Sequence, residues 1–261
     1  MSTAVNWEWR KTLACFFRTY LVGACFNTRG LQNVGLAFAM EPGLRALYKD
    51  PASLKQARKR HLRLYNTHPY WTPFLVGYFL FLERKIAQGA LPPRALGRIR
   101  QTTTYTLSAI GDSVFGGSLL IFWSLSTICL LLYDQRALAF VWLGVALAAI
   151  QVFKAFTFWR GLTSGLTFLQ KVKAWDLINK GQRVKITNAL LLLLIWYRIY
   201  PINNPPWDSP WTFWAWAGLV VLCAWIAERT MLFREGVVVA AGMAFLFWPV
   251  LVELWAMVLG K

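Results

Sequence analysis

Residues 114–133, VFGGSLLIFWSLSTICLLLY, form a run of twenty residues without a single charge. A helix needs about twenty apolar residues to cross the hydrocarbon core of a bilayer. Uninterrupted runs of this length are typical of membrane-spanning helices. The stretch therefore predicts a transmembrane helix, and this prediction decides the fold class.

The composition of the whole chain supports the same class. Of its 261 residues, 57% are hydrophobic and 15% are charged, against about 45–50% and about 25% in soluble domains. The 15 tryptophans fit as well, because indole rings favour the membrane–water interface. We therefore expect an all-α integral membrane protein with amphipathic or re-entrant N-terminal helices, followed by about five transmembrane helices.

Four further apolar segments complete the expected set of spans: residues 137–159, 186–200, 211–227 and 236–260. The loop 201–210 holds no Lys or Arg, whereas the segments before 114, at 160–185 and at 228–235 are basic. Since basic loops stay in the cytoplasm, this pattern predicts five spans with a cytoplasmic N-terminus. Arg136 and Lys261 are the exceptions.

The segments outside these spans have other features. Residues 11–48 predict an amphipathic helix that is broken or re-entrant at its glycines. Residues 73–83 are too few to span and fit an interfacial or re-entrant helix. Residues 89–97 are expected to form a turn or linker. Residues 160–180 are amphipathic and are expected at the cytoplasmic interface or folded back against the preceding helix. We accordingly divide the chain into three regions: 1–107 with the amphipathic and re-entrant helices, 108–200 with three spans, and 201–261 with a C-terminal hairpin.

The net charge of +17 has two interpretations. Basic proteins attract nucleic acid, but the apolar composition argues against that partner. Asp50-Pro51 predicts the start of a short basic helix. This helix is either a solvated cytoplasmic face near lipid phosphates or a docking surface for an acidic soluble partner. Its basic residues are Lys55, Arg58, Lys59, Arg60 and Arg63.

Two stretches carry residues that are able to do chemistry. In SAIGDSVFGG, residues 108–117, Asp112 either lines a cavity at a helix break or, with Ser113, caps the following span. The two histidines are His61, expected to be exposed, and His68, expected at a helix end because Pro69 follows it. A membrane enzyme with His68 and Asp112 as acid and base is the alternative to a structural or binding role.

The sequence lacks the motifs of several kinds of functional site. There is no phosphate-binding glycine loop, and the four cysteines at 15, 25, 129 and 223 form no CxxC pair. We therefore expect no metal site, no disulfide framework and no cofactor.

Four stretches occur in an order and spacing that resembles the IID component of the mannose-family sugar phosphotransferase system. They are RTYLVGACFNTRGLQNVGLAFAMEPGLRALY (18–48), KRHLRLYNTHPY (59–70), SAIGDSVFGG (108–117) and RGLTSGLTFLQKVKAWDLINKGQRVKIT (160–187). The resemblance extends over about residues 10–195.

The resemblance implies a transporter subunit in the bacterial cytoplasmic membrane. Such a subunit pairs with a IIC component, assembles as a trimer of pairs and translocates a hexose. Soluble IIB and IIA proteins carry the phosphoryl group, so the IID component is not an enzyme. Because residues 198–210 are shorter than the corresponding family segment, a diverged subunit with a regulatory or scaffolding role is the second possibility. The implied sugar-binding candidates are Asn27, Gln32, Asn33, Asn66, Thr67, His68, Asp112 and Ser113.

Overall fold

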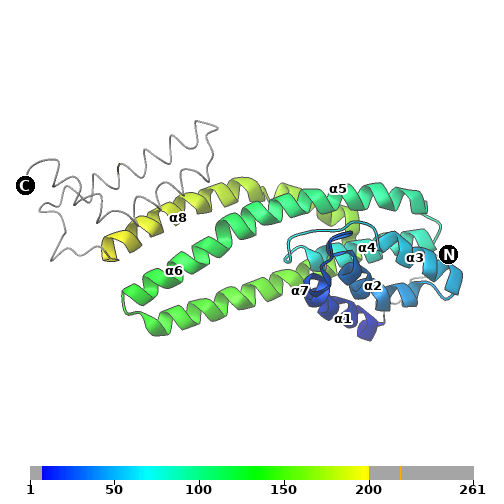
Figure 1. The fold of residues 1–261 in the computed structure, drawn as a ribbon, viewed down its shortest axis with the longest axis horizontal. Helices are drawn as coiled ribbons and strands as arrows, with labels where there is room; N and C mark the ends of the chain where they lie inside the picture. Colours follow the sequence, from blue (N-terminus) through cyan, green and yellow to red (C-terminus); the bar gives the residue numbers. More distant parts are fainter. Residues whose placement is uncertain (1–7, 200–217, 219–261) are drawn as a thin grey trace, which may run out of the picture. The chain divides into compact units, whose positions relative to one another are not determined.

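The computed structural model describes residues 8–199 and Gly218, and the regular elements of this part are all helices (Figure 1). The chain divides into two compact units, residues 1–195 and 196–261. The elements are α1 Trp9–Arg18, the 3₁₀ helix η1 Thr19–Cys25, α2 Asn33–Leu47, α3 Pro51–His61, α4 Thr72–Ala87, α5 Pro93–Gly111, the π-helix η2 Asp112–Leu119, α6 Leu120–Leu132, α7 Arg136–Ala174 and α8 Leu177–Ile199. The predicted all-α class is confirmed.

The predicted break within residues 11–48 is also confirmed. The chain leaves α1 through η1, turns back and enters α2. Asn27 holds the turn, since its side-chain Oδ1 accepts a hydrogen bond from the Gly30 amide at 2.8 Å. The backbone of Gly35 lies against the Val22 carbonyl group, where a Cβ atom would clash. A glycine at 35 therefore lets α2 pack directly on η1.

Helix α3 begins as predicted and ends earlier than predicted. Asp50 caps it, with Oδ2 accepting from the Ser53 amide at 2.8 Å. The helix ends at His61, seven residues before His68. The following segment pairs instead with the α1–α2 turn, where the Gln32 amide donates to the Tyr65 carbonyl at 2.8 Å. The prediction that His61 is exposed is wrong, because its side chain faces α4 and is fully buried.

Helix α4 forms the centre of the core. Residues 71–80 are all buried within the protein, so the interfacial alternative for residues 73–83 is wrong, and the re-entrant alternative stays a prediction. Its main neighbour is α7. Gly77 lies against the Phe158 carbonyl and Gly161 against the Phe74 carbonyl. The two glycines let the helix backbones approach closely, as small residues do between membrane helices.

Helices α5, η2 and α6 form one continuous segment, drawn as a long rod in Figure 1. Residues 93–97 are therefore helical, and the prediction of a linker through residue 97 is wrong. The helix also runs without interruption across the expected boundary at 107–108. Within η2, the Ser118 hydroxyl donates to the Ser113 carbonyl five residues earlier at 3.0 Å. The backbone bond that defines a π-helix joins residues five apart, and here the Leu120 amide donates to the Phe115 carbonyl.

Helix α7 runs back along α6 and then bends. Trp142 Nε1 donates to Ser126 Oγ at 2.9 Å between the two helices. The bend lies at Gly165, whose φ of 46° places it in the left-handed region, with the Phe81 ring beside it. The non-helical backbone of Gly165 divides α7 into two helical pieces, and the second piece ends at Ala174. Its predicted position, at the interface or folded back against the preceding helix, stays a prediction. After a turn at Asp176, α8 starts at residue 177, nine residues before the span expected at 186.

Two of the described helical segments, 93–132 and 136–174, are long and apolar enough to cross a membrane. Only 22% and 11% of their most apolar windows are buried within the protein. These helices therefore present apolar surface outward, as lipid-facing helices do. The spans expected at 211–227 and 236–260 lie outside the described residues, apart from Gly218.

Candidate functional site

A small polar cleft lies where η1, the segment 68–73 and α7 meet. Its volume is about 150 Å³. The residues that line it are Thr19, Tyr20, Val22, Gly23, Gln32, Pro69, Thr72, Pro73 and Lys154. Hydroxyl, amide and ammonium groups thus converge on one site, which is a usual arrangement for a polar ligand.

Lys154 is the central charge of this cleft. Its Nζ atom lies 4.4 Å from the centroid of the Tyr20 ring and 5.2 Å from that of Tyr70. Such cation–π contacts stabilise an ammonium group that lacks full hydration. The Tyr20 hydroxyl donates to Gln151 Oε1 at 2.5 Å. The Tyr20 side chain is therefore joined to α7 by a hydrogen bond and by its contact with Lys154.

His68 lies beside this cleft and packs against the π-helix. Its ring stacks on Phe115, with centroids 5.4 Å apart, and its Nδ1 accepts from the Tyr70 amide at 3.3 Å. Gly111 leaves room for the His68 side chain. Burial lowers the pKa of His68, and this effect exceeds the opposite effect of the nearby Asp112 charge. His68 is therefore held as a neutral, packed side chain.

The amide side chains predicted to bind sugar form hydrogen bonds within the turn between α1 and α2. Asn27 Nδ2 donates to Asn33 Oδ1 at 2.9 Å, and Asn33 Nδ2 donates to the Leu62 carbonyl at 2.5 Å. Gln32 Oε1 accepts a hydrogen bond from the backbone amide of Thr67 at 3.2 Å. Gln32 also lines the polar cleft. Asn66 is exposed. Of these residues, Gln32 is the one that joins the turn to the cleft.

Asp112 and Ser113 do not cap a span. Helix α5 continues directly into η2 at Asp112, so that interpretation is wrong. Asp112 is exposed and is not among the cleft residues. In the described part of the chain no direct hydrogen bond joins Asp112 to His68, although the Asp112 charge is close enough to oppose the lowering of the His68 pKa.

The sequence contained a signal for the cleft that the prediction did not use. Lys154 is the one charge within the apolar run 137–159. A charge at membrane depth usually faces a protein cavity. Thr19 and Tyr20 gave no comparable signal, because their position depends on the η1 turn.

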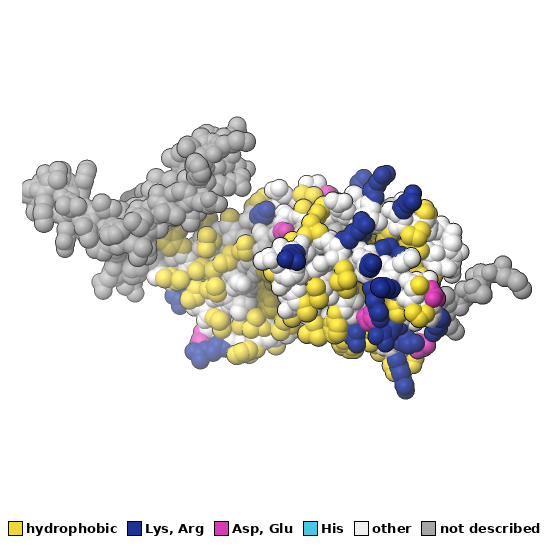
Figure 2. Space-filling view, turned by 45° about the vertical axis from the view of Figure 1, so that its right-hand side comes forward, with side chains coloured by type: hydrophobic (Ala, Val, Ile, Leu, Met, Phe, Trp, Pro, Cys, Tyr) yellow, Lys and Arg dark blue, Asp and Glu magenta, His cyan; other side chains and the backbone are white. Residues whose placement is uncertain are grey.

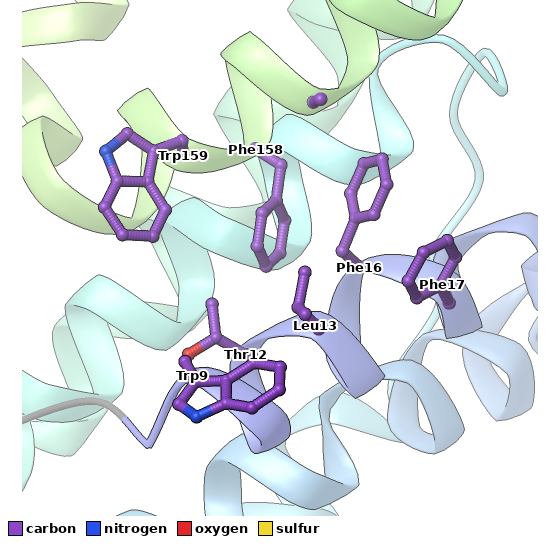
Figure 3. A pocket seen from close by; sticks show the side chains of 8 residues that line it. Trp9, Thr12, Leu13, Phe16, Phe17, Phe158 and Trp159 are labelled. Carbon is purple, nitrogen blue, oxygen red and sulfur yellow. The ribbon is translucent and has the colours of Figure 1, made fainter.

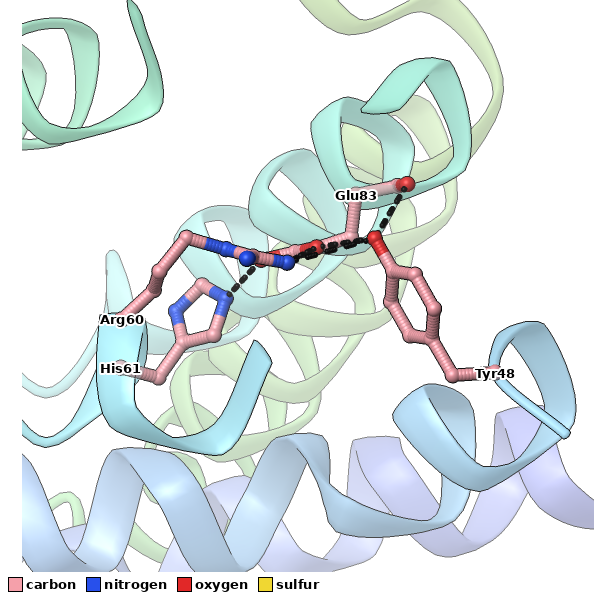
Figure 4. A network of polar contacts seen from close by, with 4 residues as sticks. All are labelled: Tyr48, Arg60, His61 and Glu83. Carbon is pink, nitrogen blue, oxygen red and sulfur yellow. Dashed lines mark hydrogen bonds and ion pairs between the residues drawn. The ribbon is translucent and has the colours of Figure 1, made fainter. Parts of the chain in front are cut away.

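A second polar cluster ties α2, α3 and α4 together (Figure 4). The buried Glu83 carboxylate accepts from Arg60 Nη2 at 2.7 Å, from Tyr48 Oη at 2.7 Å and from His61 Nε2 at 2.8 Å. Burial raises the pKa of Glu83, but His61, Arg60 and Tyr48 outweigh it and lower the pKa to about 2. Glu83 is thus a buried, fully bonded carboxylate.

This cluster changes what the basic helix presents to solvent. Arg60 points inward to Glu83, and Arg58 bonds Glu41. Lys55, Lys59 and Arg63 are exposed. Lys and Arg side chains gather around α2, α3 and the start of α5, whereas hydrophobic side chains cover the long helices (Figure 2).

Within the described residues no three His, Cys, Asp or Glu side chains are grouped to hold a metal ion.

Residues 8–193 match the sequence model of a protein family, the PTS system mannose/fructose/sorbose family IID component. The chain belongs to this family. The match takes in every residue of the polar cleft and of the Glu83 cluster.

Similar proteins support this assignment. The mannose-specific EIID component of Escherichia coli K12 is 33% identical over 105 residues, which are 40% of this chain and 37% of that protein. The fructose permease IID component of Bacillus subtilis is 25% identical over 111 residues, 42% of this chain and 40% of that protein. These matches span well under half of the curated relatives' length.

Two solved structures share the fold. One, described as a membrane protein, has a TM-score of 0.68 at 18% identity and covers 92% of this chain and 96% of its own. A chain from the mannose transporter ManYZ in complex with microcin E492 has a TM-score of 0.53 at 19% identity, over 91% and 94%. This IID component is therefore an all-α membrane protein.

Proposed function

We propose that this IID component forms, with a IIC-like membrane subunit, the sugar-translocating part of a phosphotransferase transporter in the bacterial cytoplasmic membrane. The substrate is a mannose-type hexose, and soluble IIB and IIA proteins supply the phosphoryl group. The family match over residues 8–193 carries this proposal. The names of the mannose-specific and fructose relatives support a hexose as the substrate.

The polar cleft supplies the chemistry for a role in translocation. A hexose has hydroxyl groups all around its ring, and it is bound by mixed donors and acceptors beside aromatic rings. Lys154, Gln32 and Tyr20 offer such groups. The cleft volume of about 150 Å³ is below the usual range for a complete ligand pocket. We therefore assign this cleft one side of a sugar pathway, with a IIC-like subunit completing it.

Sugar uptake tests this proposal directly. The chain is produced with a IIC-like partner and with IIB and IIA proteins, in cells that lack their own mannose uptake. We expect uptake of radiolabelled mannose only when all components are present. A complex that assembles but takes up no sugar contradicts the transport role and favours the regulatory or scaffolding alternative.

Variants separate the cleft from assembly. We expect Lys154→Gln to lower uptake at least severalfold while the complex still copurifies. Asp112→Asn is expected to lower uptake more than assembly, because Asp112 lies exposed at the start of the π-helix. Lys180→Gln, an exposed lysine of α8, is the control. If all three variants take up sugar as the wild type does, neither the cleft nor Asp112 takes part in the sugar pathway.

His68 is proposed as a packing residue at the edge of this pathway. We expect His68→Gln to leave phosphorylation by the soluble partners intact and to weaken uptake or stability, because the Phe115 stack is lost. Acid-labile phosphate on His68 contradicts this role.

We also propose that the exposed basic residues dock the phosphoryl-carrying partner. Lys55, Lys59 and Arg63 form this surface, and exposed Arg94 and Arg98 of α5 extend it. The Arg63 guanidinium approaches Gly97 of α5, which brings the two groups together. The double variant Lys55→Glu/Lys59→Glu should weaken partner binding, most strongly at low salt. Arg45→Glu on α2 is the control and should bind the partner as the wild type does. Unchanged partner binding by the double variant excludes this surface as the docking site.

A further inference from the structure

A second pocket, apolar and larger, lies between α1 and α7 (Figure 3). Its volume is about 390 Å³. Helix α1 contributes Trp9, Thr12, Leu13, Phe16 and Phe17, and helix α7 contributes Ala155, Phe158 and Trp159. The α1 residues 9, 13, 16 and 17 lie on one face, as helical spacing requires. No step of the proposed transport function uses this pocket.

Large side chains in the walls of this pocket are exposed. Trp9 is 66% exposed, Phe17 62% and Trp159 55%. Large apolar side chains that form one exposed surface mark a site for a partner or for lipid. The α7 wall belongs to a segment whose apolar window is only 11% buried. The pocket therefore opens at an exposed apolar surface of a helix that is long and apolar enough to span a bilayer.

The composition of α1 is typical of a helix at the boundary of a bilayer. Helix α1 is amphipathic: its apolar face lines the pocket, while Arg10, Lys11 and Arg18 occupy its other positions. Such helices lie in the plane of the interface. Tryptophans gather at the same level, and one stands on each wall. An acyl chain that enters here has its headgroup close to the polar face of α1.

Arg10 gives the pocket its charge preference. It is exposed, and its guanidinium lies 5.5 Å from the ring centroid of Trp9. Its neighbour Lys11 is bonded to Glu8 at 2.9 Å, whereas Arg10 has no acidic partner among the described residues. An unpaired guanidinium beside an apolar groove complements a phosphate group, which it can bind through two hydrogen bonds.

We propose that this pocket binds one anionic phospholipid, with an acyl chain between α1 and α7 and the headgroup phosphate on Arg10. The bound lipid fills the gap between the two helices and fixes α1 against α7. The site is independent of the polar cleft, since the two share no residue.

Native mass spectrometry of the full-length chain, in the complex in which it is isolated, tests the proposal. The protein is delipidated and then given phosphatidylglycerol or phosphatidylcholine with the same acyl chains. We expect retained phosphatidylglycerol in clear excess. Arg10→Gln should lower its retention about fivefold and leave phosphatidylcholine unchanged. Ala155→Phe, which fills the pocket, should remove both lipids.

Two control variants match these changes. Arg29→Gln removes another exposed arginine, and Ala148→Phe enlarges an exposed alanine elsewhere on α7. Both should retain phosphatidylglycerol as the wild type does. Equal retention of the two lipids by the wild type, or full retention by Arg10→Gln and Ala155→Phe, overturns the proposal.

A photo-crosslinking amino acid in place of Phe17 identifies the occupant in native membranes. We expect an adduct of phospholipid mass. An adduct of polypeptide mass, from a membrane partner or a second copy of the chain, also overturns the proposal.

Discussion

Glu83 shows how a single buried charge organises the N-terminal half. Three donors from two other helical regions surround its carboxylate. Arg60 and His61 come from α3, and Tyr48 follows the end of α2. Two residues of the basic helix, Arg60 and His61, therefore form hydrogen bonds in the protein interior. The composition of this helix had predicted a surface exposed to solvent.

We expect Glu83→Gln to lower the free energy of unfolding by about 3–5 kcal/mol, because it leaves Arg60 without its counter-charge. Thermal unfolding in detergent measures this. Arg45→Gln, which removes an exposed ion pair with Glu41, should cost about 1 kcal/mol or less. Equal effects of the two variants contradict a special role of the buried cluster.

Acid should weaken the same cluster. The folded pKa of Glu83 is about 2, below its ordinary value of 4.5. Its contribution to stability is therefore complete above about pH 4.5 and is lost as the pH falls from 4.5 toward 2. We expect the unfolding temperature of the wild type to fall in this window more steeply than that of Glu83→Gln. Parallel pH profiles of the two proteins oppose this assignment.

At the scale of elements, the contact between α4 and α7 holds the core together. Gly77 and Gly161 place each backbone against a carbonyl of the other helix. The same close approach leaves α7 fixed where Lys154 enters the polar cleft. The stability of the core and the proposed role of Lys154 in uptake therefore depend on the same helix pair.

We expect Gly161→Ala to destabilise the protein by about 1–3 kcal/mol, because its Cβ atom meets the Phe74 carbonyl oxygen at 2.6 Å. Gly144→Ala on the same helix has nothing within 4 Å of the added atom. Helix propensity predicts that this control stabilises by up to about 1 kcal/mol. Thermal unfolding measures both, and destabilisation by Gly144→Ala alone contradicts the packing argument.

For the whole molecule, the distribution of charge fixes the proposed orientation. Basic residues gather around α2, α3 and the start of α5, and apolar residues cover the long helices (Figure 2). On the positive-inside rule we propose that the basic part lies in the cytoplasm. The turn between α6 and α7 then lies on the opposite side of the membrane.

Thiol labelling of cells tests this orientation in a chain whose exposed Cys25 is replaced by serine. Asp134→Cys, in the α6–α7 turn, should react with a membrane-impermeant reagent on intact cells. Lys59→Cys, on α3, should react only after the membrane is opened. The reverse pattern contradicts the cytoplasmic N-terminus.

The sequence alone determined the class of this protein, because a charge-free run of twenty residues has few folded environments other than a bilayer. It also determined the break after α1 and the Asp50 cap of α3, since glycine and capping signals are local. The family resemblance on four stretches is confirmed by the match over residues 8–193.

Only the tertiary structure decided which polar residues face one another. Asn27 and Asn33 are used in the turn, the GDS stretch is π-helical, and Lys154 reaches the cleft between two tyrosine rings. Side-chain hydrogen bonds, cation–π contacts and the burial of His61 depend on residues far apart in the chain. Local sequence patterns carry no information on such distances, and so the site emerged from the packing of the helices.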